Sequence, residues 1–219
     1  YWQGEKSIAR LRVDFAPPLG GEGTFEVDAI RIVDEAAVSS GERVWRGAGV
    51  GAWHCIEGAT AQTKAEAVVF SSDKGLVGAL MSPAVKIPSD ETCVVSVEMA
   101  VNEGDSASLA WASDAVSGLN RKSFRLKADG RFHTYNIDVG SQKSWSGNIV
   151  LLKLVPVMQK GAQATIRSVC VSEAPQGAAD VAVEQARLTD AINRAGRVAP
   201  LLIQFSNAGG NDAKNVTLA

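Results

Sequence analysis

The sequence has few histidines and cysteines, which are common zinc ligands and common bases and nucleophiles near neutral pH. It contains two histidines, His54 and His133, and three cysteines among 219 residues. The motifs HExxH, CxxC, GxSxG and GxxxxGK[ST] are absent, so no zinc site, nucleophile elbow or phosphate loop has a local sequence signature. The missing motifs do not exclude a Ser-His-Asp or Cys-His site assembled from distant residues, because residues far apart in sequence can meet in the fold. We expect no catalytic residue, metal ion or cofactor in this region.

The chain also lacks a charge excess and long apolar runs. Lysine plus arginine number 22 and aspartate plus glutamate number 24, giving a net charge of -2. Nucleic acids and anionic membrane surfaces attract basic proteins, so neither is expected as a partner. No stretch approaches 18 uncharged apolar residues, and no insertion into a membrane is expected. Hydrophobic residues make up 46%, which excludes intrinsic disorder.

The cysteine count is odd, so at least one thiol lacks a disulfide partner within the chain. Cys93 has the same parity as Val95, Val97 and Met99 in an alternating run. That parity predicts a free thiol buried beside the core.

Alternation of apolar and polar residues dominates the middle of the chain. In residues 94–101, every second side chain is apolar, with Val95, Val97 and Met99 on one face. A period of two predicts a half-buried strand. Similar short runs occur at 67–70, 107–111, 123–127, 133–139 and 149–155, separated by glycine-containing turns. Many short strands with little helical periodicity predict an all-β sandwich or jelly roll.

One pattern of residues occurs twice, about 140 positions apart, which indicates the ends of two domains of the same kind. The matched pairs are Ile8 with Ile149, Leu11 with Leu152, Val27 with Ile166 and Ile30 with Val169. Trp2 and Trp145 lie at equivalent places in the two copies.

The composition changes after residue 175. Helix propensity alone favours a helix over residues 183–195. The alternative is two strands, at 181–188 and 200–205. We favour the strands, because residues 201–218 read as strand, glycine-rich turn and strand.

Five short motifs occur in order within residues 39–175. They are Gly51-Ala52-Trp53, Ser82-Pro83, Leu109-Ala110-Trp111, the run from Asp129 to Tyr135, and Trp145-Ser146-Gly147 followed by Ile149 and Leu152. With these motifs, residues 39–175 resemble the jelly-roll modules of galactose-binding-like fold that accompany catalytic domains in secreted bacterial polysaccharide-degrading enzymes. The resemblance departs from the usual Leu-Arg-Val/Ile-Asp ending at residues 153–156.

The last part of the chain contains Asn207-Ala208-Gly209-Gly210, followed by Ala213 and Asn215-Val216. With this pattern, residues 176–219 similarly resemble the first strands of an immunoglobulin-like adhesion or spacer module.

These resemblances imply a slice through a longer protein, an expectation that Tyr1 in place of Met also suggests. Residues 1–38 would be the last strands of a preceding jelly roll, 39–175 a complete one, and 176–219 the start of the immunoglobulin-like module. The implied function is a non-catalytic carbohydrate-binding or spacer region of a secreted or cell-surface glycoside hydrolase or polysaccharide lyase. The partners would be a polysaccharide or glycan and the neighbouring modules. The alternative is a structural surface or adhesion protein built of β-sandwich repeats.

Sugar binding needs a flat aromatic ring beside polar groups that orient hydroxyls. Trp111 precedes a polar loop, and we therefore expect a carbohydrate site formed by Trp111, Asp114, Asn120 and Arg121. The competing interpretation is that Trp111 belongs to the hydrophobic core. An exposed Trp111 would tolerate replacement by alanine with an unchanged melting temperature. Asp129 and Gly130 are expected to form a turn, with a structural Ca²⁺ site as the alternative.

We predict that a fragment of residues 39–175 unfolds cooperatively by itself, because it contains a full set of strands. A fragment of residues 1–38 should stay unfolded, since two or three strands cannot enclose a core. Urea unfolding followed by tryptophan fluorescence tests both statements. A broad, non-cooperative transition of the 39–175 fragment would show that its boundaries are wrong.

Overall fold

The computed structural model describes residues 43–73, 75–178, 181–188, 201–207 and 209–211. The predicted partial jelly roll of residues 1–38, the first copy of the repeat and the expected last strand lie outside the described residues. The prediction for these segments therefore stays a prediction.

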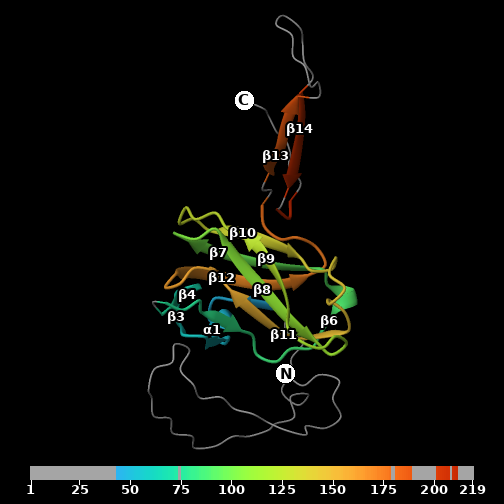
Figure 1. Ribbon diagram of the computed structural model, residues 1–219. Helices are drawn as coiled ribbons and strands as arrows, with labels where there is room; N and C mark the ends of the chain where they lie inside the picture. Colours follow the sequence, from blue (N-terminus) through green and yellow to red (C-terminus); the bar gives the residue numbers. More distant parts are fainter. Residues whose placement is uncertain (1–42, 74, 179–180, 189–200, 208, 212–219) are drawn as a thin grey trace, which may run out of the picture.

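Twelve strands form two antiparallel sheets that pack face to face (Figure 1). The first sheet has the order β10-β7-β12-β4-β3, and β1 pairs with β12 beyond the end of β4. Its strands are β1 (Val44–Arg46), β3 (Ala59–Lys64), β4 (Ala67–Ser72), β7 (Val94–Val101), β10 (His133–Asp138) and β12 (Gln163–Ser172).

The second sheet has the order β2-β5-β11-β8-β9, and β6 pairs with β11. Its strands are β2 (His54–Ile56), β5 (Ala79–Met81), β6 (Ile87–Pro88), β8 (Ser106–Ser113), β9 (Asn120–Arg125) and β11 (Asn148–Val155). The helices of the described residues are the short α1 (Ala48–Gly51) and η2 (Ser89–Glu91).

The core lies between the sheets, as the alternation predicts. Val95, Val97 and Met99 of β7 are fully buried, and so are Leu152 and Leu154 of β11. The all-β jelly-roll sandwich expected from the sequence is therefore confirmed. No helix within the described segments has the length and apolar character needed to cross a membrane.

A β-bulge in β12 interrupts the alternation. Ile166 pairs with Met99 and Ser168 pairs with Glu98, so Arg167 is the extra residue of the bulge. The insertion lets Ile166 and Val169 both enter the core although they are three positions apart. Arg167 and Ser168 consequently both lie on the outer side of the sheet.

The tryptophans of the sandwich belong to its core. Trp111 is 0% exposed and Trp145 is 5% exposed. Their rings meet edge to face, with centroids 5.6 Å apart. The indole N–H of Trp111 donates to the carbonyl of Ser144, and that of Trp145 donates to the carbonyl of Thr92. The interpretation of Trp111 as a core residue is confirmed, because this strand position faces the opposite sheet, and its use as an exposed stacking ring is wrong.

The three cysteines are free thiols and none is fully buried. Cys93 precedes β7, and its thiol donates to the carbonyl of Glu173. The prediction of a free thiol at Cys93 is confirmed, whereas its side chain is only half-buried. Burial raises the pKa of the Cys55 thiol, which packs against the core.

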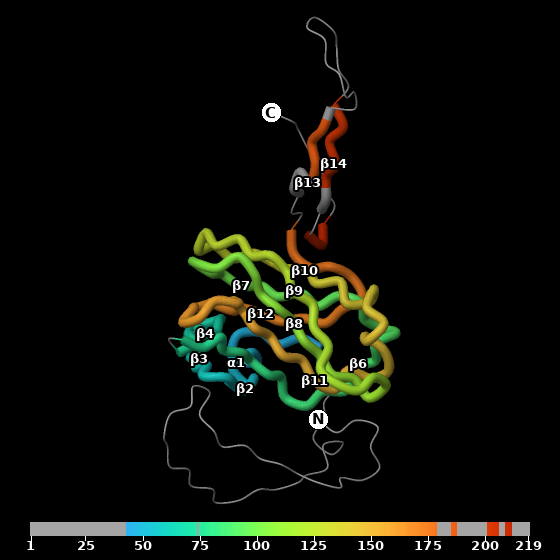
Figure 2. The backbone as a smooth tube through the Cα atoms, in the orientation of Figure 1, coloured from blue at the N-terminus to red at the C-terminus, as the bar shows by residue number. Residues whose placement is uncertain are grey.

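After the sandwich, β13 (Val181–Leu188) and β14 (Leu201–Asn207) pair as a separate antiparallel sheet (Figure 2). The strand interpretation is thus confirmed against the helix that propensity favours. The pairing explains it, because cross-strand contacts outweigh helix propensity at Ala186 and its neighbours. That these strands begin an immunoglobulin-like module stays a prediction.

Trp111→Ala is expected to destabilise the chain by about 3–5 kcal/mol, the usual cost of truncating a buried aromatic side chain. The variant should melt many degrees below the parent in a calorimetric scan. Leu119→Ala is the control, because Leu119 is 51% exposed and its loss should change the melting temperature little. Equal melting temperatures for parent and Trp111→Ala would contradict the burial of this ring.

Candidate functional site

The structure separates the four residues of the predicted carbohydrate site. Asn120 pairs with Trp111 and shares its inward face, while Arg121 pairs with Ala110 on the outer face. Asp114 is exposed, and its carboxylate accepts hydrogen bonds from the backbone and side-chain N–H groups of Asn148. Trp111 cannot stack on a sugar from the core. That Asp114, Asn120 and Arg121 bind a sugar stays a prediction, but Trp111 cannot supply an aromatic ring beside them.

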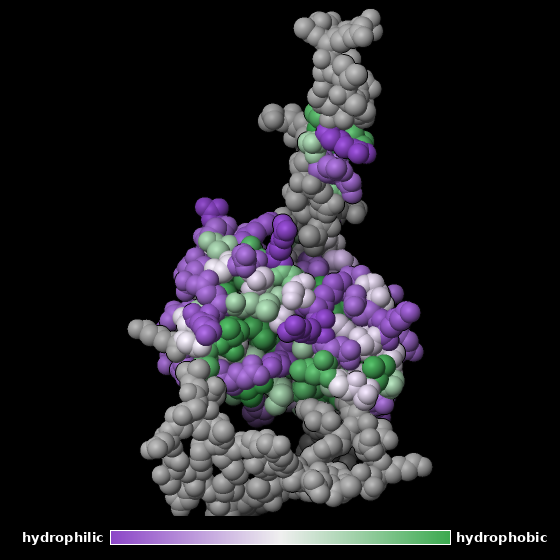
Figure 3. Space-filling model, viewed as in Figure 1, coloured by the Kyte–Doolittle hydropathy of each residue, from purple (hydrophilic) through white to green (hydrophobic). Residues whose placement is uncertain are grey.

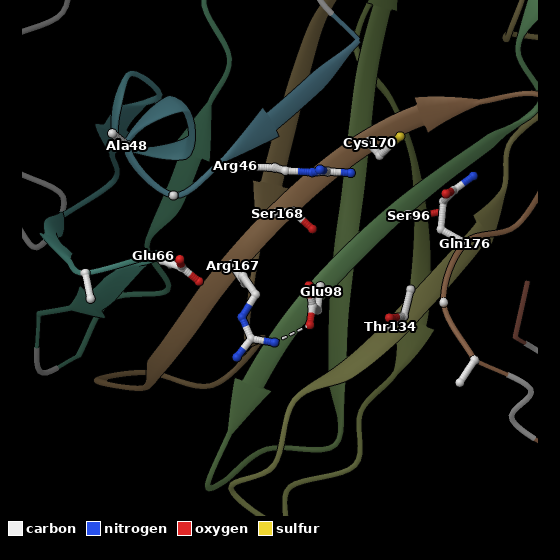
Figure 4. A pocket seen from close by; sticks show the side chains of 14 residues that line it. Arg46, Ala48, Glu66, Ser96, Glu98, Thr134, Arg167, Ser168, Cys170 and Gln176 are labelled. Atoms are coloured by element: carbon white, nitrogen blue, oxygen red, sulfur yellow. Dashed lines mark hydrogen bonds and ion pairs between the residues drawn. The ribbon is translucent and has the colours of Figure 1, made fainter.

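A groove of about 850 Å³ lies instead on the outer face of the first sheet (Figure 4). We call it the outer groove. Its floor comes from β7, β10 and β12, one wall from residues 46–48 and 65–66, and the other wall from residues 176–178. The floor residues are Ser96, Glu98, Thr134, Arg167, Ser168 and Cys170.

Strand pairing aligns the floor in cross-strand rows. Thr134 pairs with Glu98, Glu98 with Ser168, and Ser168 with Arg46, so one row crosses four strands. Three interstrand steps make this row about 14 Å long. Because neighbours in a strand point to opposite faces, the same strands supply the core with Val97, Val169 and other apolar residues.

Arg167 is held at two places. Its guanidinium donates to the carboxylate of Glu98 at 2.5 Å, and it lies 3.7 Å from the centroid of the Phe132 ring. A carboxylate and an aromatic face both favour a guanidinium, so the side chain is fixed across the floor. Phe132 is 38% exposed, but the stacked arginine occupies one of its faces.

Arg46 and Glu66 carry the other two charges of the outer groove. Within the described residues, neither has a hydrogen-bond or ion-pair partner. Figure 4 shows the Arg46 guanidinium extended over β12 toward Cys170, whereas the Glu66 carboxylate points toward Arg167. Gly47, between Arg46 and α1, has φ of 49°, a backbone conformation in which a side chain would be strained.

The wall at residues 176–178 is attached to the floor by hydrogen bonds. The backbone N–H of Gln176 donates to Asn136 Oδ1, and Asn136 Nδ2 donates to the Gln176 carbonyl. Ser96 Oγ also donates to Asn136 Oδ1, at 2.6 Å. From beyond β14, the N–H of Gly210 donates to the carbonyls of Gln176 and Gly177. The wall therefore joins the sandwich to the segment that follows the hairpin.

Sequence reasoning missed the outer groove, although one signal for it was present. In Ile166-Arg167-Ser168-Val169 two polar residues separate apolar ones, which is the pattern of a bulge in an alternating strand. That pattern locates Arg167 and Ser168 on the outside. It does not identify the distant strands beside them.

The outer groove can exchange hydrogen bonds with a polar ligand. It offers guanidinium donors, carboxylate acceptors and hydroxyls that do both. No cluster of three histidine, cysteine, aspartate or glutamate residues suited to a metal occurs in the part of the chain that the structure describes. The Asp129 carboxylate accepts from the Arg131 N–H and contacts a ring nitrogen of His133 at 2.9 Å, as a turn residue does.

Figure 3 shows a face of the sandwich on which polar residues predominate and apolar residues form separate small patches. The exposed large apolar side chains of the sandwich are Val44, Leu119, Phe132 and Met158.

Comparisons with known proteins give similarities of structure only. No protein-family model matches the chain, and no curated protein sequence matches it. A mutant of a family 29 carbohydrate-binding module complexed with mannohexaose is 14% identical, with a TM-score of 0.41, over 56% of this chain and 82% of that chain. Another structure of a family 29 module is 13% identical, with a TM-score of 0.43, over 56% and 80%. The glycoside hydrolase domain of Endo-D from Streptococcus pneumoniae R6 is 16% identical, with a TM-score of 0.40, over 73% and 27%.

The turn beside the outer groove predicts a specific acid sensitivity. The Arg131 backbone N–H and the His133 side chain lower the pKa of Asp129. A lowered folded-state pKa stabilises the fold above the unfolded value of roughly 3.9, and this contribution is lost as the pH falls through the folded value. Asp129→Asn should thus be less stable than the parent near pH 6, and the difference should vanish near pH 2.

Urea unfolding of both proteins between pH 2 and 7 measures this dependence. Asp90→Asn is the matched control, because Asp90 is exposed and has no hydrogen-bond or ion-pair partner among the described residues. A difference between Asp129→Asn and the parent that does not change with pH would contradict the prediction.

Proposed function

We propose that this region binds polysaccharide or glycan chains in the outer groove, as a non-catalytic module of a secreted or cell-surface glycoside hydrolase or polysaccharide lyase. The observation that carries the proposal is the cross-strand row Thr134, Glu98, Ser168 and Arg46 in a groove bounded by two walls. The motifs that resemble jelly-roll modules of polysaccharide-degrading enzymes support the same function.

The chemistry of the row suits a sugar chain. Sugar hydroxyls both donate and accept hydrogen bonds, and the floor presents carboxylate, guanidinium and hydroxyl groups at neighbouring strand positions. These groups lie on strands fixed by the core, so little order is lost when a ligand binds. The groove is open, and weak binding with a Kd on the order of 10 μM to 1 mM is expected.

The second candidate function is a spacer in a surface or adhesion protein. The observation that favours it is the burial of Trp45, Trp53, Trp111 and Trp145, which leaves no exposed tryptophan in the described sandwich. Sugar-binding surfaces often use such rings for stacking. In a spacer, the hairpin of β13 and β14 would begin the next module of a rod.

A glycan array probed with the complete 219-residue chain tests the binding function. Ser168→Trp should lower the affinity for any bound glycan at least tenfold, because the new ring fills the floor without entering the core. Ser123→Trp is the matched control, since Ser123 is exposed on β9 of the other sheet. It should bind like the parent.

The outcomes separate the two candidate functions. An array without signal for plant, algal and host glycans would favour the spacer. Equal loss of binding in Ser168→Trp and Ser123→Trp would place the site outside the outer groove. Circular dichroism of both variants shows whether the sandwich stays folded.

A further inference from the structure

We infer that the ligand of the outer groove is an acidic saccharide, whose carboxylate or sulfate group is bound by Arg46. This inference rests on the proposed function, because it names the class of glycan that the same groove takes.

Of the four charged side chains that line the outer groove, two pair with each other and two have no partner among the described residues. Arg167 and Glu98 form an ion pair and neutralise each other. Arg46 is exposed, and no carboxylate or carbonyl of the described residues accepts its donors. A free guanidinium has five N–H donors in a planar fork, which matches a carboxylate or sulfate group.

Glu66 is the remaining charge, and its position is compatible with an anion at Arg46. Figure 4 shows Glu66 beside Arg167, while Arg46 extends over the part of the floor nearer Cys170 and Ser96. The unpaired carboxylate and the unpaired guanidinium thus lie over different parts of the floor. Glu66 can accept from the hydroxyls of one sugar unit while Arg46 binds the acidic group of another.

The floor provides no flat ring for a neutral sugar. Its residues are polar or small, and Phe132 at the edge is covered on one face by Arg167. A ligand must therefore gain its binding energy from hydrogen bonds. An anionic group adds charge attraction to the guanidinium and a bidentate match to its fork that a hydroxyl lacks, which favours a ligand that carries acidic groups.

The backbone of Arg46 is fixed in position by strand pairing and by its neighbours in the chain. It pairs with Ser168 at the end of β1, next to Trp45, which is 1% exposed and meets Trp53 edge to face. The following N–H, of Gly47, donates to the Arg167 carbonyl at 3.0 Å. The backbone of Arg46 is thus fixed on both sides, so binding must order only its side chain.

The experiment compares acidic oligosaccharides with neutral partners of the same length. Isothermal titration of the complete chain would use oligogalacturonate and its carboxyl-reduced form, and a sulfated galactan oligosaccharide with its desulfated form. We expect at least one acidic member to bind tenfold or more tightly than its neutral partner. Its affinity should fall between 50 and 300 mM NaCl, because salt screens the contact with Arg46.

Three variants identify the residue responsible. Arg46→Ala should remove most of the preference for the acidic member, and Arg46→Lys should keep part of it as a point charge without the fork. Arg125→Ala is the control, since Arg125 is exposed on β9 of the opposite sheet. It should retain the full preference. Melting temperatures of all three should match that of the parent.

Each outcome has a separate meaning. Equal affinity for acidic and neutral partners would overturn the inference and leave the proposed function intact. Equal loss of preference in Arg46→Ala and Arg125→Ala would also overturn it, by showing attraction to surface charge in general. Binding of no saccharide in the titrations and on the array would overturn the proposed function itself.

Discussion

The pairing of β12 is the constraint on which the sandwich and its groove both depend. This strand pairs with β7 along one edge and with β4 and then β1 along the other. Its inward residues, among them Ile166 and Val169, complete the core, while Ser168 and Cys170 face outward. The bulge at Arg167 determines both which residues of β12 point into the core and which point outward, because the register of the pairing decides the face of every side chain.

Long alternating strands could be predicted from the sequence, and short ones could not. The run Val94–Val101 coincides with β7, because eight residues of alternation leave little ambiguity. The strands β1, β2, β5 and β6 have two or three residues each, too few to show a period. Their place is set by pairing with distant partners such as β11 and β12.

The candidate site was less predictable than the fold. Trp111 lies next to a polar loop in sequence, but the parity of β8 directs its ring into the core. The outer groove combines residues from six separate segments, so only pairing register brings Arg46 beside Ser168. The irregular spacing around Arg167 was the one local indication of it.

The division of each strand into an inner and an outer set bears on how such a protein diverges. Substitutions at Thr134, Ser168 or Arg46 alter the surface offered to a ligand and leave the packing between the sheets unchanged. Selection for a new ligand can therefore act on these positions at little cost in folding free energy. Related chains could consequently keep the spacing of their buried residues while the residues of this surface differ freely between lineages.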